Sequence, residues 1–305
     1  MPATSDLSPY AGQLAALGTA ACWAFSALIF AAAARRIGVL ALNLFRLVAG
    51  MGFLSLAAWA LRGAALPTDV SAHAWVWLGV SGLIGFVFGD LCLFLAYGKI
   101  GTRLASLMMA LSPPMTAVIG WLVLGETLTG RDVLGMTLTV GGIAWAVLER
   151  HPEAEGSAPA PRASLSGLVL GAGGALGQAG GLVLSKLGMG GYHPVAATQV
   201  RVLAGIAGYA VLLTALRWWP KVGEAAGDGR ALGLSTLGAF FGPFLGVSLS
   251  LFAVRHTVAG VAASIMALQP VMIIPLVVLL HRERVGFGGV AGALVAVAGV
   301  ALLFL

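Results

Sequence analysis

Charged residues are scarce in this chain. Only 9% of its 305 residues are charged, with 17 Lys and Arg against 11 Asp and Glu, whereas a soluble domain carries about 25%. So little charge cannot coat a water-facing surface of this size, which excludes a soluble enzyme, a disordered chain and a fibrous protein. With 59% apolar residues and a mean hydropathy of +0.99, the chain is expected to be a polytopic membrane protein.

Other absences narrow the function further. The only two cysteines, Cys22 and Cys92, lie in apolar segments, so we expect neither a disulfide framework nor a metal site. No basic run exceeds Arg35-Arg36, which argues against a nucleic-acid partner despite a net charge of +6. HExxH and Asp-rich motifs are missing as well. A polytopic membrane enzyme is therefore the weakest alternative, and we expect no cofactor.

Apolar runs separated by short polar or Gly/Pro breaks predict an all-α membrane protein with ten transmembrane helices. The expected spans are residues 11–33, 39–61, 74–97, 102–124, 130–148, 165–186, 194–216, 231–254, 258–280 and 286–304. The Pro- and Glu-containing stretch 149–164 divides them into two sets of five. We therefore predict a first five-helix repeat at 11–148, a linker at 149–164 and a second repeat at 165–305.

The two halves are similar in sequence. Residues 89–148 aligned without a gap to residues 246–305 have 16 identities in 60 positions, and in the second span of each half Arg46 matches Arg201. An odd number of helices in each repeat gives the two repeats opposite orientations. Inverted repeats around a central cavity are typical of secondary transporters.

The distribution of Lys and Arg predicts the orientation. Four lie on the side that holds the N-terminus and eleven on the other side. Because cytoplasmic loops carry the excess of positive charge, both termini are expected outside the cytoplasm.

The repeated pattern resembles the EamA family of the drug/metabolite transporter superfamily. The residues that carry the resemblance are LxPxxTAxxGxxxLGExLTxxxxxGxxLxxGG at Leu111–Gly142, with a degenerate copy at Leu268–Gly299. The resemblance covers nearly the whole chain and implies a multi-pass protein of the inner (plasma) membrane that transports a small organic metabolite. Within the family, the chain is most similar to bacterial aromatic amino-acid exporters, which implies amino acids as substrates. We expect a monomer in the lipid bilayer.

Ionisable residues inside apolar spans are candidates for function by default, because an unpaired charge in hydrocarbon is costly. Asp90 could carry a coupling proton, hold a substrate ammonium or pair with Arg46. Arg46 and Arg201 could anchor a substrate carboxylate, but their symmetric placement favours a structural role. Glu126 and Glu283 follow spans 4 and 9, where helix capping or contacts between the repeats are expected.

Spans 4 and 9 each carry a polar residue beside a proline, Ser112-Pro113 and Gln269-Pro270. Proline breaks a helix and frees a backbone carbonyl, which could then bind a substrate ammonium. The face of span 4 that holds Ser112 is expected to line the cavity, as is the mirrored face of span 9. The full set of predicted substrate-binding residues is Trp23, Asn43, Phe86, Asp90, Met108, Met109, Ser112, Gln178, Gln199, Phe244, Ser248, Met266 and Gln269.

The glycine-rich stretch GAGGALGQAGG at 171–181 lacks the Lys-Ser/Thr of a phosphate loop. Gly173, Gly177 and Gly181 instead share one face, which predicts close helix packing.

The sequence therefore predicts a transporter that exports amino acids, including aromatic ones, by alternating access. The alternative substrate is a lipophilic cation or drug, which Asp90 and the aromatic residues would bind.

Overall fold

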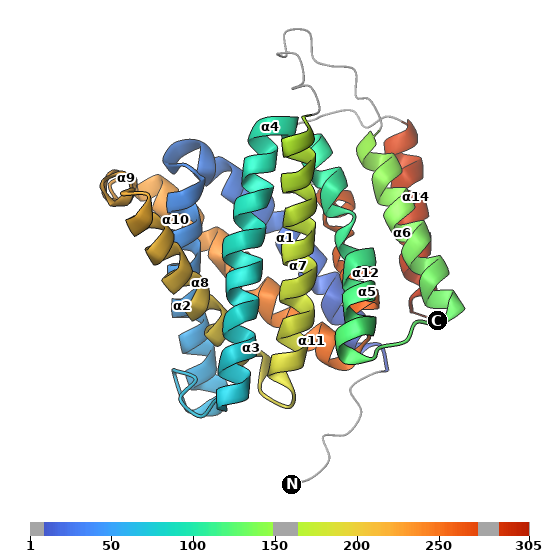
Figure 1. Ribbon diagram of the computed structural model, residues 1–305, viewed down its shortest axis with the longest axis horizontal. Helices are drawn as coiled ribbons and strands as arrows, with labels where there is room; N and C mark the ends of the chain where they lie inside the picture. Colours follow the sequence, from blue (N-terminus) through green and yellow to red (C-terminus); the bar gives the residue numbers. More distant parts are fainter. Residues whose placement is uncertain (1–8, 149–163, 274–286, 305) are drawn as a thin grey trace.

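The computed structural model describes residues 9–148, 164–273 and 287–304, and every regular element in these ranges is helical (Figure 1). The helices of the first half are α1 (Ala11–Ile37), α2 (Val39–Arg62), α3 (Ala72–Gly82), η1 (Leu83–Gly89), α4 (Asp90–Met109), α5 (Ser112–Leu124) and α6 (Gly130–Leu148). Those of the second half are α7 (Leu165–Met189), α8 (Pro194–Ala215), α9 (Trp219–Ala226), α10 (Gly229–Ala239), η2 (Phe240–Gly246), α11 (Val247–His256), α12 (Ala259–Met266) and α14 (Phe287–Leu302).

The helices have the length and composition of membrane spans. Among the described residues, eight helical segments of 18 residues or more are apolar enough to cross a bilayer, and two shorter apolar helices lie at 259–273 and 287–302. The prediction of an all-helical, multi-pass membrane protein is therefore confirmed. The predicted ninth span, 258–280, extends beyond the described residues, and Glu283 lies outside them.

Two predicted spans are not uniform α-helices. The spans expected at 74–97 and 231–254 each contain a π-helical segment, η1 and η2. The alignment that pairs Gly89 with Gly246 places the two segments at the same position in both halves. Glycines weaken both segments and Pro243 removes a hydrogen-bond donor from η2, so the helix widens locally.

Two connections also differ from the prediction. The helical backbone of α4 continues to Met109, past the loop expected between 97 and 102. The chain nevertheless reverses direction within α4. The evidence is that Ala96 and Met108, twelve residues apart, would both contact a Cβ on Gly171 of α7. In the second half, α9 occupies a stretch expected to be a loop between 216 and 231.

The glycine face of α7 packs closely against the third span, as the sequence predicts. A Cβ on Gly177 would lie 2.5 Å from the Cα of Gly89, and one on Gly181 would lie 3.1 Å from the Cα of Gly85. Gly173 faces Cys92 in the same way. The predicted role of these glycines is confirmed, and their contacts fix α7 against η1, the segment that carries Phe86.

We expect Gly177→Ala to lower the thermal stability of the purified protein in detergent. The added methyl group would force α7 away from Gly89, and such overpacking costs about 1–3 kcal/mol. The melting temperature measures the effect. Gly180→Ala is the matched control, because its Cβ would meet only Ile84 at an ordinary 3.6 Å. Equal melting temperatures for the two variants would contradict the close packing.

Candidate functional site

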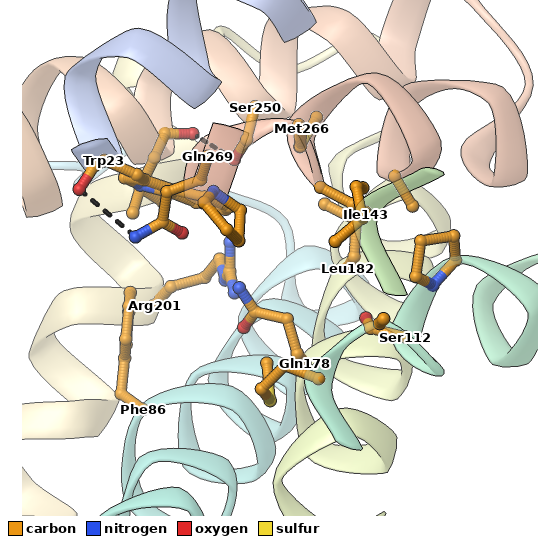
Figure 2. A pocket seen from close by; sticks show the side chains of 17 residues that line it. Trp23, Phe86, Ser112, Ile143, Gln178, Leu182, Arg201, Ser250, Met266 and Gln269 are labelled. Atoms are coloured by element: carbon orange, nitrogen blue, oxygen red, sulfur yellow. Dashed lines mark hydrogen bonds between the residues drawn. The ribbon is translucent and has the colours of Figure 1, made fainter. Parts of the chain in front are cut away.

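A cavity of about 120 Å³ lies between the two halves of the chain, large enough for several water molecules. Figure 2 shows the side chains that line it. Its lining residues are Trp23, Phe86, Met109, Ala110, Ser112, Pro113, Ile143, Gln178, Leu182, Arg201, Val247, Ser250, Ala263, Met266, Ala267, Gln269 and Pro270. Both halves contribute residues to this wall, so a relative movement of the halves would change the shape of the cavity.

The lining residues come largely from equivalent positions of the two repeats. Met109 corresponds to Met266, Ser112 to Gln269 and Pro113 to Pro270. In the register that matches Arg46 with Arg201, Trp23 corresponds to Gln178. The cavity therefore lies where equivalent segments of the two repeats meet. The methionines and prolines are identical in the two repeats, whereas Ser112 and Trp23 are replaced by Gln269 and Gln178.

Both proline-bearing spans break at the cavity. In the first half α4 ends at Met109 and α5 begins at Ser112, and in the second half α12 ends at Met266. Proline has no N–H, so Pro113 and Pro270 cannot donate to the carbonyls four residues earlier, those of Met109 and Met266. Gln269 donates from Nε2 to the carbonyl oxygen of Trp23 at 3.3 Å (Figure 2).

Arg201 of α8 provides the positive charge of the cavity wall. The residue is only 5% exposed, and its Nε has no hydrogen-bond partner among the described residues. Its guanidinium carbon lies 5.1 Å from the centre of the Phe86 ring, within the range of a cation–π interaction. A Cβ on Gly82 would lie 2.3 Å from the Arg201 carbonyl oxygen, so that glycine lets α3 approach α8 at this point.

The π-helical segment η1 presents Phe86 to this guanidinium. Tyr209 of α8 donates from its hydroxyl to the Phe86 carbonyl oxygen at 2.9 Å. The hydrogen bond ties η1 to α8, the helix that carries Arg201. Figure 2 shows Arg201 and Gln178 extending into the same space, with Gln269 nearby.

Arg46 and Asp90 form an ion pair instead, one of the alternatives that the sequence left open for Asp90. The Arg46 guanidinium also lies over the Phe30 ring, 5.5 Å from its centre. Neither partner lines the cavity. The repeat alignment explains the difference from Arg201, because the position of Asp90 in the first repeat corresponds to Val247 in the second.

The remaining predicted site residues do not line the cavity. Gln199 donates from Nε2 to the Ala65 carbonyl oxygen at 2.7 Å, and Met108 lies against Gly171. Phe244 packs on Phe53, with ring centres 5.9 Å apart. Asn43 and Ser248 are also buried elsewhere, and neither side chain has a hydrogen-bond partner within the described ranges. The structure thus brings together seven of the predicted substrate-binding residues: Trp23, Phe86, Met109, Ser112, Gln178, Met266 and Gln269.

Several lining residues carry no signal in the sequence. Ile143 and Leu182 are ordinary apolar residues in apolar spans, and Ser250 donates its hydroxyl hydrogen to the Val247 carbonyl oxygen at 2.7 Å. Among them, only Val247 could have been found through the repeat relation, because it corresponds to the candidate Asp90. No group of three or more His, Cys, Asp or Glu residues that could hold a metal ion occurs in the part of the chain that the structure describes.

Glu126 joins the two halves at one end of the bundle. One carboxylate oxygen pairs with the Lys186 ammonium of α7, and the other accepts a hydrogen bond from the Ala259 backbone N–H at 2.8 Å. Lys186 also donates to the Thr257 carbonyl oxygen at 2.6 Å. Glu126 therefore caps the N-terminus of α12, where the helix dipole favours a negative charge. We call Glu126, Lys186, Thr257 and Ala259 the clasp.

A second contact between the halves lies in the loops. The Tyr192 hydroxyl donates to the Asp69 carboxylate at 2.7 Å, and Arg62 pairs with the same carboxylate. The hydrogen bond from Arg62 is the largest of the influences that hold the pKa of Asp69 below its usual value, and the hydrogen bond from Tyr192 follows it. Asp69 is exposed, so this loop contact is expected to contribute little to stability.

These features define the class of the protein. A multi-pass helical bundle with a cavity between two sequence-related halves, which are joined at one end by contacts such as the clasp, has the architecture of a membrane transporter.

The chain belongs to the EamA-like transporter family, whose profile matches residues 10–148 and again 165–305. A solved structure described only as a crystal structure of a protein is similar in fold, with a TM-score of 0.72 and 18% sequence identity over 97% of this chain and 96% of that one. No curated protein matches the chain. The family resemblance expected from the sequence is confirmed, and the protein is an EamA-family membrane transporter.

The clasp makes a testable prediction about the ion pair between Glu126 and Lys186. Each of Glu126→Gln and Lys186→Met leaves one partly buried charge without its partner, so each is expected to lower the melting temperature. The double variant removes both charges, and its loss should be smaller than the sum of the single losses, because contacting residues do not behave additively. Additive losses in this double-mutant cycle would show that the two side chains are not coupled.

Proposed function

We propose that the protein exports amino acids, including aromatic ones, from the cytoplasm by alternating access. The observation that carries this proposal is the buried Arg201 guanidinium, which lines the cavity without an ion-pair partner among the described residues. A buried charge is costly unless it is paired. A substrate carboxylate supplies the missing partner, and Arg binds carboxylates in a planar, bidentate geometry.

The rest of the cavity wall suits an amino acid. Gln178, Gln269 and Ser112 offer amide and hydroxyl groups, and the carbonyls freed by Pro113 and Pro270 offer further acceptors. An aromatic side chain would lie against Trp23 and Phe86, and the methionines would adapt to side chains of different shape. The sequence favoured a structural role for Arg201. Arg201 lines the cavity, whereas Arg46 pairs with Asp90. This difference supports a role for Arg201 as the anchor of the substrate carboxylate.

Alternating access in this proposal uses ten helices in two inverted five-helix repeats. The π-helical segments at matched positions and the paired proline breaks support a repeat relation that extends to local helix geometry. The clasp closes the end of the bundle where α1 begins, because Gly12 of α1 packs against His256 and Thr257. We propose that the clasp opens when the repeats exchange their packing, and that the protein works as a monomer in the inner membrane with both termini outside.

A lipophilic cation fits the cavity less well. None of the described lining residues is acidic, and Arg201 would repel a cation. Asp90, which the sequence offered as the cation's partner, pairs with Arg46.

The proposal predicts uptake of radiolabelled amino acids, phenylalanine among them, into liposomes that contain the purified protein. Arg201→Gln should reduce this uptake by about tenfold or more, because a charged hydrogen bond to the carboxylate contributes roughly 1.5–3 kcal/mol. Arg35→Gln, which removes an exposed arginine, is the matched control and should leave uptake unchanged. No uptake above that of empty liposomes, from protein that remains folded, would contradict the proposal.

Asp90 is proposed to carry the coupling proton. When Asp90 is protonated its ion pair with Arg46 is lost, which links a proton to the contact between α2 and α4. Asp90→Asn should therefore abolish the dependence of transport on a pH gradient while exchange of internal for external amino acid continues. Uptake and exchange are measured with and without the gradient, and an unchanged gradient dependence would rule out this role.

A further inference from the structure

The charges buried near the cavity do not balance. Arg46 and Asp90 neutralise each other, while Arg201 has no ion-pair partner in the ranges that the structure describes. The carboxylate of Asp90, about one helical turn beyond Phe86, is already hydrogen-bonded to Arg46. The cavity therefore carries one uncompensated positive charge on its wall.

This charge favours one end of an amino acid over the other. A carboxylate gains a charged partner in Arg201, but an ammonium finds no acidic side chain among the described lining residues. Neutral acceptors can hydrogen-bond an ammonium, yet they do not cancel its charge, and burial without cancellation is costly. The ammonium is thus tolerated in this cavity, whereas the carboxylate is selected.

The side-chain surroundings of Arg201 add a second preference. The guanidinium lies against the Phe86 ring at 5.1 Å, and Trp23, Leu182 and Met266 supply apolar wall around the same space. A carboxylate that is joined to an aromatic or branched apolar group would place its charge at Arg201 and its apolar part on these residues.

From this arrangement we infer that the cavity recognises apolar monocarboxylates, with or without an α-ammonium. Aromatic carboxylates that lack the amino group are then ligands as good as the amino acids themselves, and amines that lack the carboxylate are not ligands. This inference rests on the cavity of the proposed function, but it names a substrate class that an amino-acid exporter need not accept.

The test compares four compounds of the same shape: phenylalanine, 3-phenylpropionate, 2-phenylethylamine and phenylalaninamide. Each is titrated at pH 7.5 against the purified full-length protein in detergent, and ligand-induced stabilisation reports binding without any need for transport. We expect 3-phenylpropionate to act at the same or a lower concentration than phenylalanine. The amine and the amide should need about tenfold more or show no effect, since neither offers a partner to Arg201.

Variants of the guanidinium separate recognition from a general loss of stability. Arg201→Gln should abolish the stabilisation by 3-phenylpropionate, while Arg201→Lys, which keeps the charge, should retain part of it. Arg35→Gln is the control and should bind like the unchanged protein. If Arg201→Gln proves unstable, the ranking of the four compounds on the unchanged protein still decides the question.

The outcomes distinguish this inference from the proposed function. Binding of 3-phenylpropionate without amino-acid uptake in liposomes would support the carboxylate class and overturn amino-acid export. Amino-acid uptake with stabilisation by phenylalaninamide or 2-phenylethylamine but not by 3-phenylpropionate would overturn the inference and leave the exporter standing. Binding of phenylalanine alone would also overturn it, because both charged groups would then be required.

Discussion

The cost of an unpaired charge in an apolar bundle constrains much of this structure. Two arginines occupy matched positions of the two repeats, and each must find a partner. Arg46 has Asp90 and the face of Phe30. Arg201 has the face of Phe86 but, within the described residues, no carboxylate. One guanidinium is thus paired inside the bundle, while the other lines the cavity.

The difference between the two arginines arises from divergence of the repeats at a few positions. Gly50 packs on Pro243, and its counterpart Gly205 packs on Phe86, so the backbone approach is preserved while the facing side chain differs. Asp90 is likewise replaced by Val247 in the second repeat. A symmetric scaffold can therefore carry an asymmetric site, in which only one arginine faces the cavity.

Close backbone packing keeps that site in place. Gly177 and Gly181 bring α7 onto η1, and Gly82 brings α3 onto α8 beside Arg201. These contacts position Phe86 between the guanidinium and the rest of the bundle. Because small residues meet backbone to backbone at these contacts, there is little room for the helices to shift there.

The sequence by itself determined the class, the family and the repeat. Low charge, long apolar runs and repeated Pro, Glu and Arg residues can be read from the sequence without knowledge of the fold. It also indicated seven of the cavity residues. Four of them, Met109, Ser112, Met266 and Gln269, lie beside helix breaks that Pro113 and Pro270 mark in the sequence. Only the tertiary structure decided which arginine is paired, since that depends on which helices meet. For the same physical reason, Gln199 and Phe244 do not line the cavity, whereas Leu182 and Ser250 do. The neighbours of a side chain inside a bundle are set by helix packing and not by the residue's own chemistry.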